Sequence, residues 1–163
     1  MYNESIINTD VLIVGTGLAG LRAAYDCAKT GLDVLLISKG KFCSGSSFYP
    51  LTEALGAQVP DSEQDKEVYL KELLDTGSGV ANKSLCEILV DEIAGEIKRL
   101  PELGINPIKG GGRAACFAKR ERLLMIWGGW DKIRKNASKI FNNISNIRIL
   151  EYCDLIRIVT KDG

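Results

Sequence analysis

The chain has 163 residues, of which 45% are hydrophobic and 26% are charged, a composition typical of a soluble globular domain. Its 21 basic residues balance its 21 acidic residues, which argues against nucleic acid or an anionic membrane surface as the main partner. The sequence contains no histidine, which excludes Ser-His-Asp and Cys-His nucleophile schemes and histidine-ligated zinc within these residues.

Two further features bear on the compartment. No apolar run approaches the length needed to cross a bilayer, and the first ten residues lack the basic and apolar regions of a secretory signal. The five cysteines stand alone, without a C-x-x-C pair, as is typical of reduced thiols. We therefore expect a cytoplasmic protein without membrane insertion.

The N-terminal third predicts a strand, a helix and a second strand. Residues 10–14 form a short run rich in branched apolar side chains, and residues 33–38 form another. Residues 18–30 have helix-forming composition and end before Gly31, a residue suited to terminate a helix. Together they predict a right-handed βαβ unit.

The central segment predicts mainly helices. Residues 39–60 are rich in Gly, Ser and Pro and predict a loop with one helical turn near residues 51–55. Residues 63–75 predict an amphipathic helix whose acidic side chains form an exposed face and whose buried side carries Tyr69, Leu70, Leu73 and Leu74. Asn82 is predicted to cap a further helix that ends at Pro101 and Gly104 and buries Leu85, Ile88, Leu89, Ile93, Ile97 and Leu100.

The last third predicts an irregular segment at residues 105–119, then a strand, a helix and two more strands. The strands are expected at residues 123–127, 147–150 and 154–160. The helix follows the glycine pair at 128–129 and buries Trp130, Ile133, Ala137, Ile140 and Phe141. The basic side chains between residues 117 and 139 are predicted to form a solvated face: Lys119, Arg120, Arg122, Lys132, Arg134, Lys135 and Lys139.

A G-x-G-x-x-G pattern lies between the first predicted strand and helix, formed by Gly15, Thr16, Gly17, Leu18, Ala19 and Gly20. In that context the first glycine permits a tight turn, the second lets a pyrophosphate approach the backbone, and the third lets helix and strand pack closely. The free N–H groups and positive dipole end of the helix favour an anion there. The alternative is a tight turn without a ligand.

Where the second strand ends, an acid that would hold ribose hydroxyls is replaced by Ser38 and Lys39, with Lys41 close behind. A serine can hydrogen-bond a ribose, and the lysines can hold the 2′-phosphate of NADP. From spacing alone FAD and NADP are both open, and the acid-free strand end slightly favours NADP.

The following loop favours FAD. Ser38-Lys39, followed by Ser44-Gly-Ser-Ser-Phe-Tyr49, resembles the flavoprotein family of L-aspartate oxidase, fumarate reductase and the succinate dehydrogenase flavoprotein subunit. The resemblance implies that the glycine turn binds the FAD pyrophosphate and that Ser38 and Lys39 lie by the adenosine ribose. It also implies that a loop reaches the pyrophosphate and the edge of the flavin through Ser46, Ser47, Phe48 and Tyr49. The family's Ala-Gln-Gly-Gly is replaced here by Pro50-Leu-Thr-Glu53, so no particular substrate is implied.

We therefore expect an α/β fold: a Rossmann-like, three-layer FAD-binding domain with a parallel sheet, incomplete at its C-terminal end. Residues 1–163 would form the N-terminal part of one such domain. It would comprise a βαβ core at 9–38, a helical excursion at 40–128, and a returning helix and strands at 129–160. The expected function is the FAD-binding portion of an oxidoreductase that exchanges a hydride with a small organic substrate. An NADP-binding reductase domain and a non-catalytic dinucleotide-binding remnant are the alternatives. An unpaired sheet edge would favour self-association.

Overall fold

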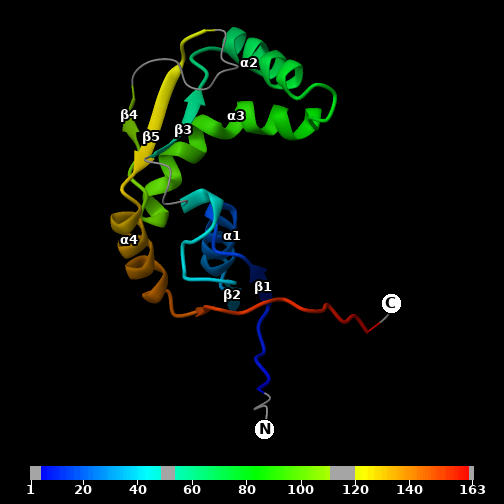
Figure 1. Ribbon diagram of the computed structural model, residues 1–163, viewed down its shortest axis with the longest axis vertical. Coiled ribbons are helices and arrows are strands. Elements are labelled where there is room, and N and C mark those ends of the chain that lie inside the picture. The colour runs from blue at the N-terminus through cyan, green and yellow to red at the C-terminus, as the bar shows by residue number, and fades with distance from the viewer. Residues whose placement is uncertain (1–4, 49–53, 111–119, 162–163) are drawn as a thin grey trace. The chain divides into compact units, whose positions relative to one another are not determined.

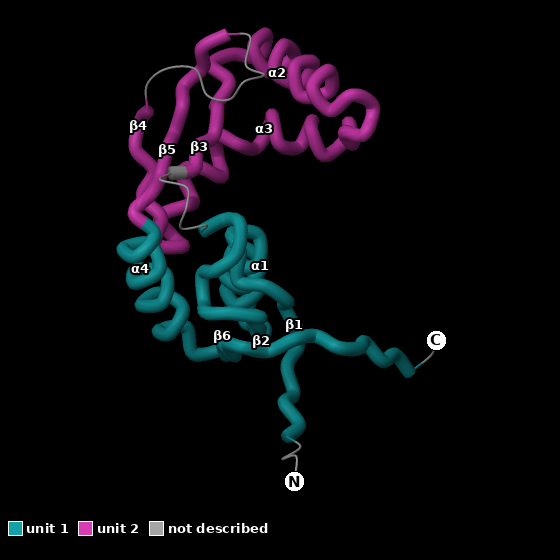
Figure 2. Tube along the Cα trace, in the orientation of Figure 1, with its two compact units in different colours: residues 1–52, 130–163 teal, residues 53–129 magenta. Residues whose placement is uncertain are grey.

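The computed structural model describes residues 5–48, 54–110 and 120–161, which form two compact units (Figure 2). Unit 1 comprises residues 1–52 and 130–163, and unit 2 comprises residues 53–129. Within the described ranges, no helix has both the length and the apolar character needed to cross a bilayer.

A parallel sheet forms the centre of unit 1 (Figure 1). Its strands β1 (Val11–Val14), β2 (Val34–Ile37) and β6 (Ile147–Leu150) confirm three of the predicted strands and pair in the order β1-β2-β6. The central strand β2 is buried along its whole length, as its uninterrupted apolar sequence requires. The predicted α/β class with a parallel, Rossmann-like sheet is therefore confirmed.

Helices α1 (Leu18–Lys29) and α4 (Trp130–Asn142) cover one face of this sheet. They meet through aromatic rings: Phe141 of α4 lies 6.4 Å from Tyr25 of α1 and 5.6 Å from Phe42, measured between ring centroids. The face of α4 predicted to be buried is confirmed at Trp130, Ile133, Ala137 and Phe141, while Ile140 is half-buried. On the opposite face of the sheet, Leu12, Val14 and Leu150 are exposed.

The strand predicted at residues 154–160 is wrong. This segment follows β6 as an extended tail without strand pairing, and Ile156 is 94% exposed (Figure 1). Two backbone hydrogen bonds join the residues just before it to the loop after β2: Cys153 N–H donates to the Ser38 carbonyl at 2.8 Å and Tyr152 N–H donates to the Gly40 carbonyl. An alternating sequence forms a strand only beside a partner strand, and the described residues provide none here.

Unit 2 contains a small antiparallel sheet as well as helices. Strands β3 (Ala54–Val59), β4 (Ile108–Lys109) and β5 (Leu123–Gly128) pair in the order β3-β5-β4. The strand predicted at 123–127 is thus confirmed as β5, while β4 lies in a segment predicted to be irregular. The description of residues 40–128 as a helical excursion needs correction, and so does the helical turn near 51–55. Of that turn, Ala54 and Leu55 are in β3, and residues 51–53 lie outside the described ranges.

The two helices predicted in unit 2 are confirmed as α2 (Glu63–Thr76) and α3 (Lys83–Arg99). The Asn82 side chain accepts a hydrogen bond from Leu85 N–H at 3.2 Å, which confirms the predicted cap. A short 3₁₀ helix, η2 (Leu100–Leu103), follows α3 and ends at Gly104, whose φ of 80° lies in the left-handed region. This confirms the predicted end.

The predicted buried stripe of α3 is only partly correct. Val90 and Ile97 are buried and Ile93 is half-buried, whereas Leu85, Ile88 and Leu89 are exposed. The reason is the direction from which α2 approaches. Lys66 of α2 forms an ion pair with Asp91 of α3 at 3.3 Å, so α2 covers the face that carries Val90 rather than the face that carries Leu89.

Acidic and basic side chains predicted to be exposed form a buried cluster in unit 2. The Arg122 guanidinium is fully buried, and its Nε donates to both carboxylate oxygens of Asp65, at 2.9 and 3.0 Å. Its Nη1 donates to the Glu72 carboxylate at 2.7 Å and to the Gln58 side chain at 3.3 Å. The guanidinium also lies over the Tyr69 ring, 4.5 Å from the centroid. These contacts compensate charges that burial would otherwise make very costly.

Candidate functional site

The glycine turn joins β1 to α1 as the sequence predicts. Gly15 has a φ of +110°, a backbone conformation that favours glycine. A Cβ atom placed on Gly20 would collide with the Gly15 carbonyl oxygen, so α1 approaches the turn too closely for any side chain at that position. The geometry therefore accounts for the first and third glycines of the pattern.

The N-terminus of α1 is open to an anion. The residue that precedes the helix is Gly17, which has no side chain to cap it, and the first turn carries no acidic residue. Of the N–H groups at this end, that of Leu18 donates to the Ser47 hydroxyl at 3.3 Å. Unpaired backbone donors and the helix dipole both favour a phosphate at such a position.

The loop after β2 brings one of its predicted residues to this turn. Ser47 lies in the 3₁₀ turn η1 (Ser46–Phe48), and its hydroxyl would be 3.3 Å from a Cβ placed on Gly17. Ser46 is exposed beside it, whereas Phe48 is buried and packs edge-on against Trp130, with ring centroids 6.2 Å apart. Phe48 therefore packs in the core of unit 1. Tyr49 lies outside the described residues.

The two residues predicted to bind at the end of β2 differ in exposure: Ser38 is buried and Lys39 is exposed. Ser38 and Thr16 are buried, and their hydroxyl oxygens are 2.9 Å apart, so this pair connects the glycine turn to the end of the strand. Ser38 also donates to the Lys41 carbonyl at 3.4 Å. Lys39 is exposed and forms an ion pair with Asp154 at 3.6 Å. Lys39 thus presents its charge to solvent while Ser38 stabilises the loop.

The prediction that Arg134 lies on a solvated face needs correction. Its side chain is 29% exposed and reaches from α4 to the loop of Ser47. Its Nε donates to the Cys43 carbonyl at 3.0 Å, and its Nη2 donates to the Phe48 carbonyl at 2.9 Å. Two backbone carbonyls five residues apart are thereby fixed by one guanidinium.

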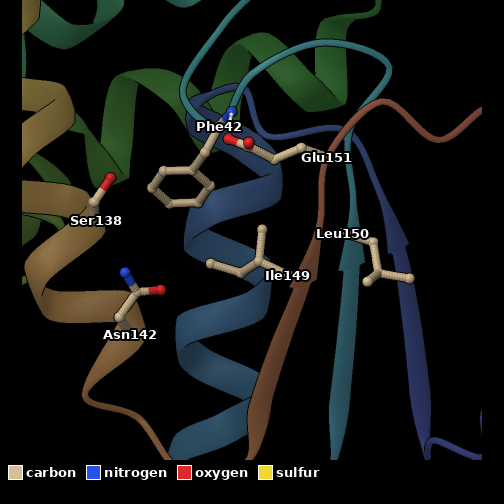
Figure 3. A pocket seen from close by; sticks show the side chains of 6 residues that line it. All are labelled: Phe42, Ser138, Asn142, Ile149, Leu150 and Glu151. Atoms are coloured by element: carbon tan, nitrogen blue, oxygen red, sulfur yellow. Dashed lines mark hydrogen bonds between the residues drawn. The ribbon is translucent and has the colours of Figure 1, made fainter.

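A cavity of about 380 Å³ lies beside the carboxyl end of β6, between this strand and α4 (Figure 3). Ile149 points toward the α4 side, and Leu150 points away from it. The Glu151 carboxylate accepts a hydrogen bond from Phe42 N–H at 2.6 Å. The other lining residues are Ser138 and Asn142 of α4. The sequence did not single out Glu151, although an acid directly after a buried strand is a recognisable signal.

Cys43 is fully buried at the start of the loop, and burial raises the pKa of its thiol to about 12, although the charge of Arg134 acts in the opposite direction. The thiol is therefore protonated and unreactive in the folded chain.

The raised pKa of Cys43 makes the free energy of unfolding depend on pH in alkaline solution. Unfolding exposes the thiol, which then ionises near its usual pKa of about 8.5. The contribution of the neutral Cys43 thiol to the free energy of unfolding is complete below that pH and is lost as pH rises toward 12. Chemical denaturation at several pH values should show the free energy of unfolding falling, relative to Cys43→Ala, by about 1.4 kcal/mol per pH unit above this point. Parallel curves for the two proteins would contradict this assignment.

Known proteins share the elements that form this candidate site. Residues 10–139 match the family model of the FAD binding domain. The chain is 32% identical over 103 residues to L-aspartate oxidase of Streptomyces coelicolor, covering 61% of this chain and 17% of that protein. It is 31% identical over 105 residues to one subunit of the CoM/CoB fumarate reductase of Methanothermobacter marburgensis, covering 62% of this chain and 19% of that one. It therefore spans about a fifth of the length of these relatives.

The fold is also found in a solved structure. The open conformation of a flavocytochrome c3 fumarate reductase superposes with a TM-score of 0.75 at 24% identity, over 94% of this chain and 28% of that chain. The family match runs from β1 into α4, and so includes the whole glycine turn and the loop that lies against it. The chain belongs to the FAD binding domain family of flavin oxidoreductases.

Proposed function

We propose that this chain binds FAD and forms the cofactor-holding part of an oxidoreductase that transfers a hydride to or from a small organic substrate. The observation that carries the proposal is the glycine turn at the N-terminus of α1, where the Ser47 hydroxyl accepts from the first N–H group, in a chain of this family. The similarity to L-aspartate oxidase and to a fumarate reductase supports the redox class.

Different residues of the chain would bind different parts of the cofactor. Backbone N–H groups at the start of α1 would bind the diphosphate, and the Ser47 hydroxyl, which accepts from Leu18 N–H, would donate its own proton to it. The exposed Lys39 at the end of β2 lies where the adenosine half of the ligand would run. The buried Thr16–Ser38 pair keeps the turn and the strand end in register. The flavin, when bound, supplies the hydride chemistry.

The proposal does not assign the substrate or the acid–base groups of the protein that act on it. The sequence has no histidine, and Cys43 is buried as a neutral thiol, so neither supplies a general base near the turn. We propose that residues beyond this chain provide the groups that bind and protonate the substrate, as its short span relative to its relatives allows.

A second candidate, binding of NADP, is favoured by one observation. No acid follows β2, and Lys39 and Lys41 are both exposed there, as a 2′-phosphate would require. Titration of the full chain with FAD, NADP and ADP separates the two candidates. We expect the chain to retain yellow colour and to alter the flavin absorbance. We also expect its free energy of unfolding to rise by about 2.7 kcal/mol when FAD exceeds its Kd a hundredfold.

The other outcomes each have a meaning. Stabilisation by NADP but not by FAD would replace the proposal with an NADP-binding domain. Stabilisation by ADP and FAD alike, with FAD alone giving colour, would support it. A chain that stays colourless and gains no stability with any of the three ligands would be a remnant without dinucleotide binding, and the proposal would be wrong.

A further inference from the structure

Residues 43–48, called here the serine loop, are held in position by α4. Arg134 donates to the carbonyls of Cys43 and Phe48, which are the first and last residues of the loop. Between these two anchors lie Ser46 and Ser47, and the Ser47 hydroxyl contacts the residue that follows Gly17 at the glycine turn. The guanidinium thus closes the loop at both ends.

The loop has a strained start and needs such external support. Cys43 has a φ of 54°, a conformation that residues other than glycine rarely adopt and that persists only where the surroundings fix it. Inside the loop, one backbone bond from Phe48 N–H to the Gly45 carbonyl, at 3.1 Å, supplies a single turn. The packing of Phe48 on Trp130 fixes the far end of the loop but not its start.

The contacts form a connected series from α4 to the helix that begins at the glycine turn. Arg134 holds the two loop ends, the loop presents Ser47, and the Ser47 hydroxyl accepts from Leu18 N–H at the first turn of α1. A lysine could reproduce only part of this arrangement, because its single ammonium lacks the planar fork that holds two separate acceptors. Asp131, itself exposed, forms an ion pair with Nη1 and leaves the other two donors to the loop.

We propose that Arg134 is a positioning residue for the diphosphate site. It acts through the serine loop, by keeping the Ser47 hydroxyl at the N-terminus of α1, and does not contact the ligand itself. This inference rests on the proposed function, since it assigns Arg134 a role at the same site.

A double-mutant cycle in the full chain tests the inference. Arg134→Gln and Ser47→Ala, alone and combined, are compared by their dissociation constants for FAD and for ADP. Each single change should weaken both ligands about tenfold, the cost of one or two hydrogen bonds. The double variant should be no weaker than the single ones, because both changes remove the same hydroxyl from the site. Arg134→Lys should recover part of the affinity. Effects that multiply in the double variant would overturn the inference.

Lys135→Gln is the matched control. It removes the same charge from the neighbouring, exposed position of α4 and should change neither dissociation constant by more than about twofold. An equal loss from Lys135→Gln would mean that general electrostatic attraction, not loop position, explains the Arg134 result.

A second readout needs no ligand. Amide hydrogen exchange should become faster at Leu18 and across the serine loop in Arg134→Gln, but not in Lys135→Gln. If the unmodified chain bound neither FAD nor ADP, the proposed function would fail while faster exchange still supported the positioning of the loop. Unchanged exchange in Arg134→Gln would overturn the inference whatever the chain binds.

Discussion

Replacing Arg122 with methionine should lower the free energy of unfolding by about 3–5 kcal/mol. The substitution keeps most of the side-chain volume but leaves the buried Glu72 carboxylate without its cation, and Asp65 with its ion pair to Arg120 at 3.3 Å. An uncompensated buried charge costs far more than a lost surface contact. Guanidinium denaturation of the full chain, followed by circular dichroism, measures the loss.

Two comparisons make this result specific. Lys71→Met breaks an exposed ion pair with Asp75 and should cost no more than about 0.5 kcal/mol. Adding Asp65→Asn and Glu72→Gln to Arg122→Met should restore a large part of the stability, because the buried negative charges are then gone. If Arg122→Met cost no more than Lys71→Met, the cluster would contribute little to the fold.

Gly20→Ala should abolish most of the dinucleotide affinity and destabilise the chain by about 2 kcal/mol. Alanine is the better helix former, but its Cβ atom would meet the Gly15 carbonyl oxygen, so α1 and the turn must separate. We expect FAD to bind roughly a hundredfold more weakly, the equivalent of two backbone hydrogen bonds to a charged ligand. Calorimetric titration and thermal melts measure the two effects.

The same substitution in α3 provides the control. Gly95 lies inside that helix with no neighbouring atom within 4 Å of a Cβ placed on it. Gly95→Ala should therefore raise stability by about 0.5–1 kcal/mol and leave FAD binding unchanged. A stabilising effect of Gly20→Ala would show that the close approach of α1 to the turn is not a feature of the folded protein.

Much of the fold could be predicted because local signals agreed with the final structure. The apolar runs of β1 and β2, the glycine turn between β1 and α1, and the cap at Asn82 each need only neighbouring residues to be recognised. Strand β3 was missed because its stability comes from pairing with β5, some seventy residues away in the sequence, and because Gly56 and the small side chains around it give a weak strand signal. Residues 154–160 show the reverse case, a strand pattern without a partner.

The burial of the charged side chains in unit 2 was not predictable for a related reason. Asp65 and Glu72 lie four residues before and three residues after Tyr69, so all three share one face of α2. That alignment with a buried aromatic residue was the available signal, but acids on a helix are usually solvated. Their burial becomes favourable through cations from the segment just before β5: Arg122 pairs with both acids and Arg120 with Asp65.

At the candidate site the sequence predicted the turn and the neighbourhood of Ser47, whereas the roles of buried side chains required the structure. Thr16 and Ser38 carry hydroxyls suited to a ligand, yet they are buried and hydrogen-bond to each other. Arg134 belongs to a basic stretch, and nothing in its local sequence distinguishes it from Lys135. Long-range contacts of this kind depend on how α4 returns to the loop after β2.

The placement of unit 2 within the chain of unit 1 bears on the order of folding during synthesis. Strand β2 pairs with β6, and all of residues 53–129 are made before β6 leaves the ribosome. Until then β2 has only β1 beside it, and its apolar edge is open to other chains, whereas unit 2 already has every residue it needs. Translation pauses between β5 and β6 would therefore lengthen the interval in which aggregation competes with folding.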